Sequence, residues 1–413
     1  MDNTNSIISI DTIIPNSKKH VQISLDSKNL IITGGNGCGK TRFLKQIHEN
    51  VSAQVDQVSN KTAKKIREEI NYRKSWMENS SPSDSNYHDW KREITEYELQ
   101  LIKAEKCKIQ LKDLSTYCTD FNEKKALLRF FPAIREQSIA HTGSIDSLSR
   151  LKQDDERNSL SKDSSSQFER YLIAFYNYGT YLLARVDDKA QGKKINAWFD
   201  DVESQLQYLF EDESLKLVYN AEEQSFYIKQ NDKDPYRLDK LSSGYQSILN
   251  IYADLLMKVE LKEISAKELS GIVFIDEIDA HLHVSLQRKI FSFFDRAFPK
   301  VQFIVTTHSP FVVQSVDNSV IYDLSSNEQL EDLSMYSYES ILKGLLGVES
   351  TSDILNDQLD EMAKLVNTAP LNKERLKELI LNIEPHEAQL NARSRAFLLL
   401  GKNALLDSTN GEE

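Results

Sequence analysis

Short runs of alternating apolar and polar residues open the chain and predict strands. Residues 7–10, 21–25 and 30–33 form three such runs, separated by polar turns. The third run leads directly into a glycine-rich turn, and a helical pattern begins near Arg42. A strand, a glycine loop and a helix in this order predict an α/β unit at the start of the chain.

A long charged stretch follows, and its apolar positions predict a projecting antiparallel helical hairpin. Polar residues 79–86 give a strong turn signal near its middle. Beyond this turn, apolar side chains recur at spacings of four and three, as in the seam of a coiled coil: Trp90, Ile94, Tyr97, Leu101, Ala104 and Leu111, with Lys108 as the polar exception. Residues 90–114 are expected to form one helix of roughly 37 Å. Two ordinary surface helices packed on the body are the alternative.

The rest of the chain predicts helices with buried strands between them. Residues 138–167 are rich in Ser and Asp and predict a mobile loop. Helical patterns cover residues 168–186, 195–210, 243–259 and 285–296, and a β-hairpin pattern covers residues 215–229. Short β-branched runs at 272–275 and 301–305 predict strands buried on both faces of a parallel sheet. Beyond residue 335 the pattern is helical to about residue 406, and a frayed tail is expected after it.

The composition excludes several classes of protein. Hydrophobic residues make up 40% of the 413, which is enough for a core and excludes a wholly disordered chain. The formal net charge of −12 does not favour nucleic-acid binding through overall charge. No apolar run reaches the ~18 residues of a membrane span, and the N-terminus resembles no secretory signal. Three scattered cysteines indicate neither a disulfide framework nor a zinc site, so a reducing, cytoplasmic setting is expected.

The glycine-rich turn has the pattern of a phosphate-binding loop. Its residues, Gly34-Gly35-Asn36-Gly37-Cys38-Gly39-Lys40-Thr41, fit G-x-x-x-x-G-K-[ST]. Glycines let the backbone form a nest of N–H groups that face phosphate oxygens, and the following helix adds its positive end. Lys40 can reach the β- and γ-phosphates, and the Thr41 hydroxyl can ligate Mg²⁺. A glycine-rich turn without a ligand is the alternative, but the preceding strand and following helix favour the phosphate loop.

Two carboxylates end the apolar run 271–275. Acidic residues at the carboxyl end of a buried parallel strand point into the crevice where α/β sheets bind ligands. Asp276 would hold Mg²⁺, commonly through water, and Glu277 would polarise the water that attacks the γ-phosphate. A solvated strand end would be the alternative reading if no phosphate loop were present.

Two further segments are candidates for the same site. Residues 241–246, Leu-Ser-Ser-Gly-Tyr-Gln, open a helix, and a Ser and a Gly at a helix start expose backbone donors that suit an anion. A simple capped helix is the alternative. His308 follows the run 301–305, where it can hydrogen-bond a γ-phosphate or the attacking water. His281 and His283 form an H-x-H pair without further ligands at metal spacing, so we do not favour a metal there.

Together, in this order, the four motifs resemble the ABC-type ATPase superfamily, in particular its soluble SMC- and RecF-like branch. The segment 275–283 is similar to that of bacterial ATPases in the OLD and antiphage-defence group, and the chain most resembles the PtuA-type ATPases of Septu systems. The resemblance implies an α/β ABC-type P-loop head, a mixed or parallel sheet with flanking helices, formed by residues 1–44 and 130–325. An inserted hairpin would span 45–129, and a C-terminal helical region with a disordered tail would span 326–413.

The resemblance also implies a mechanism with ATP and Mg²⁺ as cofactors. Two heads of a homodimer, or of a higher even-numbered homo-oligomer, would clamp two nucleotides. Lys40 and Thr41 of one head would meet Ser242 and Gly244 of the other across one γ-phosphate. Glu277 would be the base, His308 the switch sensor, and Asp279 part of the loop that crosses the interface. A glutamine loop is expected, with Gln137 as its candidate. The signature departs from the commoner LSGGQ at Ser243 and Tyr245.

Four functions compete. The first is an ATP-gated regulator of a separate nuclease, of HNH type, with DNA reached through that partner and no membrane involved. The second is a self-contained OLD-like nuclease, but the helical residues after His308 contain no D-x-D at a strand end with an acidic partner. A RecF-like DNA-repair ATPase is the third, and a hairpin arm with basic residues could serve it: Lys61, Lys64, Lys65, Arg67, Arg73 and Lys74. A solvated helix face explains that arm better. A transporter's nucleotide domain is the fourth, and the inserted hairpin argues against it.

Overall fold

The structure of the chain is a computed structural model. It describes residues 4–14, 16–55, 63–81, 84, 86–105, 107–135, 139, 146–156, 163–186, 188–262, 266–315, 319–331, 353–368, 371–390 and 392–410. The chain divides into two compact units, 1–341 and 342–413, and each is described by itself. No helix among the described residues is both long and apolar enough to cross a membrane.

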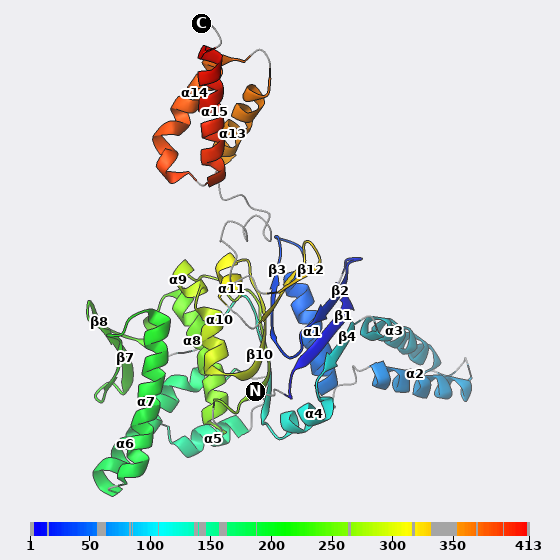
Figure 1. Cartoon of the computed structure of the whole chain (residues 1–413). Coiled ribbons are helices and arrows are strands. Elements are labelled where there is room, and N and C mark those ends of the chain that lie inside the picture. The colour runs from blue at the N-terminus through cyan, green and yellow to red at the C-terminus, as the bar shows by residue number, and fades with distance from the viewer. Residues whose placement is uncertain are drawn as a thin grey trace. The chain divides into compact units, whose positions relative to one another are not determined.

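A six-stranded sheet forms the centre of the first unit, in the order β12-β11-β3-β10-β9-β5 (Figure 1). Its strands are β3 (Asn29–Thr33), β5 (Ala126–Phe131), β9 (Ser270–Ile275), β10 (Lys300–Thr306), β11 (Ser319–Asp323) and β12 (Glu328–Glu331). All neighbours pair in parallel except β11 and β12. The predicted α/β fold with a mixed sheet is confirmed, and so are the buried strands expected at 272–275 and 301–305.

Both faces of this sheet are covered, which explains why its central strands are apolar throughout. On one face, α1 (Lys40–Val55) shares a core with the sheet formed by β1 (Ile7–Ile13), β2 (His20–Ser24) and β4 (Cys107–Leu111). On the other face lie α8 (Ser243–Glu260) and α10 (Ile290–Ala297) (Figure 1). Phe303 of β10 contacts Phe291 and Phe294 of α10 there.

Smaller elements complete the first unit. The helices are α4 (Leu114–Asn122), α5 (Leu148–Glu156), α6 (Phe168–Tyr181), α7 (Lys189–Phe210), α9 (Val284–Gln287) and α11 (Pro310–Gln314), with a π-helix at Leu182–Val186 and 3₁₀ turns at Ser165–Gln167 and Leu238–Lys240. A third sheet contains β6 (Lys216–Asn220), β7 (Ser225–Gln230) and β8 (Lys233–Arg237). The expected β-hairpin within 215–229 is confirmed as the antiparallel pair β6–β7.

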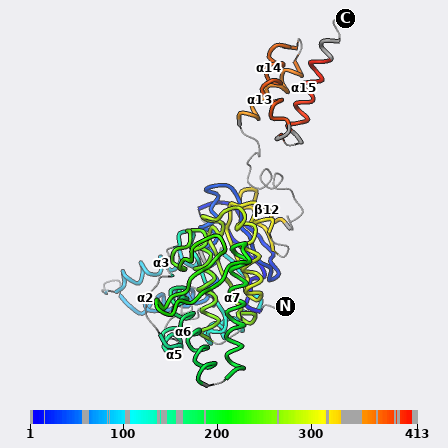
Figure 2. Tube along the Cα trace, turned by 90° about the vertical axis from the view of Figure 1, so that its left-hand side faces the viewer, coloured from blue at the N-terminus to red at the C-terminus, as the bar shows by residue number. Residues whose placement is uncertain are grey.

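The charged insertion forms a helical hairpin of α2 (Ala63–Glu78) and α3 (Tyr87–Glu105), which projects from the first unit (Figure 2). Ile66, Ile70 and Ile94 form its small apolar core. The single helix expected over 90–114 is wrong, because α3 ends at Glu105 and β4 begins at Cys107. Cys107, Ile109 and Leu111 alternate inward as a strand requires. Leu111 matched the heptad spacing only by coincidence.

Segment boundaries differ from the expected ones because strands far apart in the sequence join one sheet. Residues 107–129, expected in the hairpin, form β4, α4 and most of β5. The central sheet also extends beyond residue 325, through β12. Within the expected mobile loop 138–167, residues 148–156 form α5 and 165–167 form a 3₁₀ turn. The helix expected over 285–296 is divided into α9 and α10.

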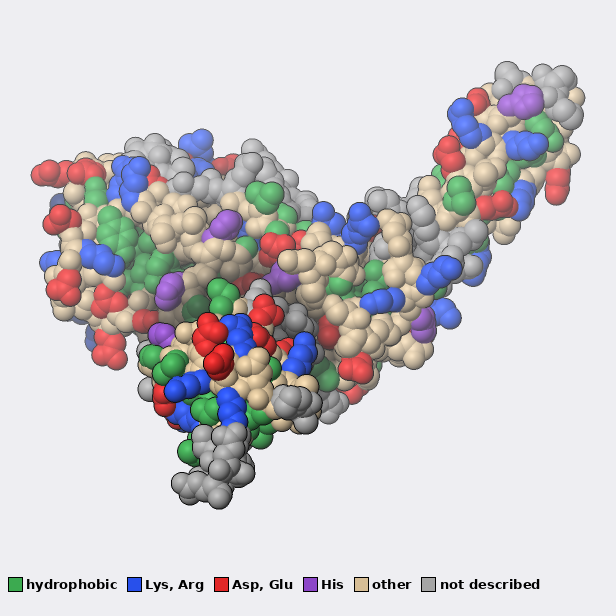
Figure 3. Space-filling view, turned by 90° about the horizontal axis from the view of Figure 1, so that it is seen from above, with side chains coloured by type: hydrophobic (Ala, Val, Ile, Leu, Met, Phe, Trp, Pro, Cys, Tyr) green, Lys and Arg blue, Asp and Glu red, His purple; other side chains and the backbone are tan. Residues whose placement is uncertain are grey.

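The hairpin surface is of mixed charge. Basic and acidic side chains alternate along the arm at the upper right of Figure 3. Arg73 is paired with Glu69 and Glu93, and Lys74 with Glu98. These pairs favour the interpretation of the basic arm as a solvated helix face, because Arg73 and Lys74 have acidic partners within the hairpin itself. Lys61 of this arm lies outside the described residues.

The second unit is a small helical bundle of its own. It contains α13 (Asp353–Val366), α14 (Lys373–Ile383), a 3₁₀ segment at Glu384–Gln389 and α15 (Ala392–Asn410). Met362, Leu376 and Leu398 are fully or almost fully buried in its core. The helix α15 continues to Asn410, so the frayed tail expected from residue 407 is helical up to that point.

We expect the folded state to lose stability in mild acid through His48. This α1 side chain packs between the rings of Phe130 and Phe274, and burial, with the charge of Arg129, lowers its pKa from 6.5 to about 4. The unfolded chain therefore binds a proton in this window that the folded chain does not. The free energy of unfolding should fall by up to about 1.4 kcal/mol per pH unit as the pH drops through this window.

Urea unfolding of the parent and of His48→Phe at several pH values checks this expectation. The phenylalanine keeps the ring contacts but cannot titrate. The difference between the two proteins isolates His48 from the other titrating groups. Parallel stability curves for the two proteins between pH 6.5 and 4 would contradict the assignment.

Candidate active site

The sequence motifs meet because the parallel strands of the central sheet end at one edge. Thr306 of β10 pairs with Ile32 of β3, and Ile275 of β9 pairs with Val305 of β10. The phosphate loop, the Asp276–Glu277 pair and His308 each follow one of these strands directly. Their side chains therefore lie at the carboxyl edge of the sheet, the usual ligand-binding edge of open α/β folds.

The glycine loop has the backbone of an anion nest. Gly34, Gly37 and Gly39 all have positive φ values, 132°, 77° and 104°, which side-chain-bearing residues rarely adopt. Lys40 is 6% exposed, and its ammonium donates to the carbonyls of Gly34 at 2.8 Å and Gly35 at 3.0 Å. The cation is therefore held beside the backbone N–H groups that would face phosphate oxygens.

The oxygen groups expected around a divalent cation are next to one another. The Thr41 hydroxyl donates to Asp276 Oδ1 at 3.2 Å, and the Thr306 hydroxyl donates to the same oxygen at 2.7 Å. Asp276 is only 3% exposed. A hydroxyl and a carboxylate beside a phosphate nest are hard oxygen donors, the type that Mg²⁺ prefers. These residues fit the ATP and Mg²⁺ expected from the sequence.

The second carboxylate follows in a constrained turn. Glu277 has φ 47°, a left-handed conformation that costs energy in a non-glycine residue. Its N–H donates to Thr306 Oγ1 at 2.7 Å, and the N–H of Ile278 donates to the Thr306 carbonyl at 3.0 Å. In the part of the chain that the structure describes, no side-chain hydrogen bond occupies the Glu277 carboxylate. This carboxylate is thus positioned by its backbone and available to a water molecule.

His308 and Asp279 lie on the same edge. Asp279 Oδ1 accepts a 2.6 Å hydrogen bond from Thr307 and longer contacts from the His308 N–H. Burial and the nearby Lys40 charge lower the pKa of the His308 imidazole below its ordinary value. The ring is therefore neutral at neutral pH, and a neutral imidazole can donate one hydrogen bond and accept another.

The signature residues begin α8. Ser242 is the N-cap by position, but its exposed hydroxyl makes no capping hydrogen bond. Gly244 is buried against the loop after β9, where a Cβ atom would lie 2.6 Å from the His281 carbonyl oxygen. Close backbone packing within the chain is therefore a sufficient reason for glycine at 244. No hydrogen bond among the described residues joins Ser242 to Lys40 or Thr41 of the same chain.

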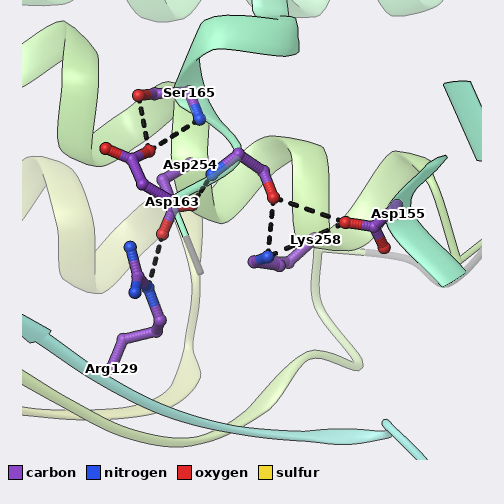
Figure 4. Close-up of polar contacts among 7 residues, drawn as sticks. Arg129, Asp155, Asp163, Ser165, Asp254 and Lys258 are labelled. Carbon is purple, nitrogen blue, oxygen red and sulfur yellow. Dashed lines mark hydrogen bonds and ion pairs between the residues drawn. The ribbon is translucent and has the colours of Figure 1, made fainter. Parts of the chain in front are cut away.

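A buried ion network holds α8 against the sheet. Arg129 of β5 donates to Asp254 of α8 at 2.8 Å, and Lys258 of α8 donates to the Ser164 hydroxyl at 2.6 Å (Figure 4). Lys258 also lies 3.8 Å from Asp155 of α5. Burial raises the pKa of Asp254, and the adjacent Arg129 charge opposes this shift. Removing one partner of such a buried pair typically costs ~3–5 kcal/mol, so the network fixes the position of the signature helix.

Some residues at this edge carried no sequence signal of their own. Ser325, in the turn after β11, accepts a 2.8 Å hydrogen bond from the N–H of Gly35. Arg135 follows β5 and contacts the backbone of the two acidic residues. Thr306 lies two residues before His308. Its hydroxyl donates to Asp276 and accepts from the N–H of Glu277, and both partners follow the neighbouring strand β9. Gln137, the candidate for the glutamine loop, lies outside the described residues.

Comparisons with known proteins agree with the motifs. A family model described as "AAA domain, putative AbiEii toxin, Type IV TA system" matches residues 30–314. The chain is 32% identical over 198 residues to the Septu protein PtuA of Bacillus mycoides (strain KBAB4), covering 46% of this chain and 27% of that protein. It is 28% identical over 161 residues to the Septu protein PtuA of Bacillus thuringiensis, and the match covers 35% of this chain and 40% of that protein. The resemblance to PtuA-type ATPases is confirmed.

Other matches are shorter or more distant. The Retron Ec83 probable ATPase of Escherichia coli is 38% identical over 95 residues, which cover 22% of this chain and 18% of that protein. The chain thus spans less than half the length of each of these three relatives. An SMC head bound to the C-winged helix domain of ScpA has a TM-score of 0.37 and 12% identity, covering 80% of this chain and 98% of that chain. An ATP-binding cassette of an ABC transporter has a TM-score of 0.33 and 12% identity, and the match covers 76% of this chain and 86% of that chain.

We expect Gly244→Ala to destabilise the protein, because the added methyl group would collide with a backbone carbonyl that cannot rotate away. A loss of about 1–3 kcal/mol in the free energy of unfolding is typical of such overpacking. Thermal and urea unfolding measure it. The matched control is Ser243→Ala, which changes an exposed neighbour on the same helix turn and should have little effect. Equal stability of both variants would refute the packing role of Gly244.

Proposed function

Since the chain belongs to this AAA-domain family, we propose that it binds and hydrolyses ATP with Mg²⁺. We propose further that it dimerises around the nucleotide and regulates a partner nuclease in antiphage defence. The observation that carries the first part is the contact between Thr41 and Asp276. It joins the phosphate loop to the acidic end of β9, with Lys40 on one side and Glu277 on the other.

Each residue then has a defined chemical task. Backbone N–H groups of the loop 34–39, other than the Gly35 N–H that donates to Ser325, and the Lys40 ammonium would bind the phosphates. Thr41 and Asp276 would hold Mg²⁺, which would supply neutralisation of phosphate charge. Glu277 accepts a hydrogen bond from the attacking water and orients it. His308, neutral at neutral pH, contacts the γ-phosphate or that water.

A second copy of the chain would complete this site. Ser242 is exposed and makes no capping hydrogen bond, and among the described residues no hydrogen bond joins it to the chain's own phosphate loop. Such a helix start suits an anion supplied by another molecule. In a homodimer, Ser242 of one protomer would meet the nucleotide held by Lys40 of the other. Gly244 would then support this contact by close packing as well as by its own backbone.

The partner nuclease is inferred from the resemblance to PtuA-type ATPases of Septu systems. A regulator is preferred to a self-contained OLD-like nuclease because the sequence after His308 contains no D-x-D at a strand end with an acidic partner. The proposed partner is a separate HNH-type subunit, through which the complex would reach DNA.

The dimer proposal is tested with nucleotide-site variants. Lys40→Ala should abolish ATP binding, because it removes the cation that faces the phosphates. Glu277→Gln should bind ATP normally, hydrolyse it at least ~100-fold more slowly, and accumulate as a closed dimer. Equilibrium binding, a phosphate-release assay and light scattering measure these three properties.

A third variant separates binding from dimerisation. Ser242→Arg, combined with Glu277→Gln, should still bind one ATP per chain, because the arginine lies at the start of α8 and leaves the phosphate loop unchanged. The double variant should remain a monomer, because the bulk and charge of the arginine would block contact with the other protomer. Dimers of this double variant at unchanged ATP occupancy would refute the role of Ser242. Parent-like hydrolysis by Glu277→Gln would refute the assignment of the base.

The nuclease assignment makes a separate prediction. The purified chain should not cut DNA with Mg²⁺ or Mn²⁺, with or without ATP, because the proposed cleavage centre belongs to another subunit. Plasmid and linear DNA cleavage assays check this, with Lys40→Ala as a control for a contaminating nuclease. Metal-dependent cutting by the parent that is lost in Lys40→Ala would favour the OLD-like alternative.

A further inference from the structure

Arg135 bridges two parts of the site that the motifs describe separately. Its guanidinium donates to the main-chain carbonyls of Asp276, at 2.6 Å, and Glu277, at 3.2 Å. The other terminal nitrogen donates to the Ser247 hydroxyl of α8 at 2.6 Å. One planar side chain thus connects the acidic end of β9 to the helix that begins with the signature residues.

These contacts act on the backbone that aims Glu277. The left-handed conformation of Glu277 is unfavourable by itself, so neighbouring groups must hold it. Thr306 of β10 binds the N–H groups of 277 and 278 on one side. Arg135 binds the carbonyls of 276 and 277 on the other. Without the guanidinium, one side of this restraint is lost.

The surroundings of Arg135 keep its guanidinium charged and require the planar shape of that group. Burial lowers its pKa to about 10, opposed by the nearby carboxylates, so the guanidinium remains protonated at neutral pH. It lines a cavity of about 140 Å³ together with Ser243, Gln246 and His281. Its Nε is buried and has no hydrogen-bond partner among the described residues. A planar fork that meets two carbonyls and a hydroxyl cannot be reproduced by a flexible lysine.

We propose that Arg135 is a positioning residue that couples the start of α8 to the orientation of Glu277. This inference rests on the proposed function. In the dimer, each α8 start contacts the nucleotide of the partner, while Glu277 of the same chain acts on its own nucleotide. A shift of α8 on closure is carried through Ser247 and Arg135 to the carbonyls of 276 and 277. The two ATP sites are thereby coupled, so hydrolysis is positively cooperative in ATP.

The first test is Arg135→Met, which keeps an unbranched apolar stem but removes the guanidinium and its donors. The kcat for ATP should fall ~10–100-fold, because the Glu277 carboxylate is no longer held in position. The KM should change less than about twofold, because the phosphate loop is unchanged. Arg135→Lys should recover only part of the kcat. Parent-like kcat in Arg135→Met, or a kcat in Arg135→Lys equal to the parent, would overturn the proposal.

A second variant addresses coupling alone. Ser247→Ala leaves the guanidinium on the two carbonyls but cuts its bond to α8. It should keep most of the kcat and lower the Hill coefficient for ATP towards one. A Hill coefficient equal to that of the parent, or a parent coefficient of one, would exclude coupling by this route. Arg170→Met, which breaks the ion pair with Asp146 elsewhere in the first unit, is the matched control and should change neither value.

Hydrogen exchange without nucleotide gives a readout independent of activity. Peptides covering 276–280 should exchange faster in Arg135→Met than in the parent. In Arg170→Met they should exchange at the parent's rate. Equal exchange in Arg135→Met and the parent would overturn the positioning role. If the parent itself fails to bind ATP or to dimerise, the proposed function fails. If the parent does both while the Arg135 variants behave like it, only this inference fails.

Discussion

The hydrogen bonds that converge on Asp276 are the interaction on which the rest of the site depends. One carboxylate oxygen accepts from Thr41, at the start of α1, and from Thr306, at the end of β10. Three segments distant in sequence are thereby fixed at one edge of the sheet. Because Thr306 also accepts from the N–H of Glu277, the position of the second carboxylate depends on the same group. A buried carboxylate oxygen left without these donors would cost free energy as an unpaired polar atom.

Packing on the two faces of the sheet supports this edge in different ways. The phosphate loop is fixed by α1, whose apolar side chains share a core with the sheet. The signature helix α8 is also buried through apolar side chains such as Ile248 and Leu255. It carries buried charges in addition, with Asp254 and Lys258 tied to β5 and to Ser164. Because a buried ion pair requires its partner in place, these contacts add a specific restraint to the apolar packing of α8.

This difference gives the site a natural place for control. The start of α8 presents Ser242 to the outside, while further along Ser247 contacts Arg135 and so the backbone of Glu277. An event at the exposed end of α8 has a short polar path to the acidic pair. In the proposed dimer, this path would carry the state of the nucleotide site to a partner protein.

The sequence by itself determined the α/β fold, the phosphate loop, and the strands that end in Asp276–Glu277 and His308, because glycine φ requirements and buried β-branched runs are local properties. It predicted a helix to residue 114, because a heptad spacing cannot be told from a strand's alternation over a few residues. Only the tertiary structure decided that Thr306 orients Glu277, that Gly244 packs on His281, and that Arg135 joins two motifs. Those relations are contacts between strands and helices distant in sequence, and no spacing along the chain encodes them.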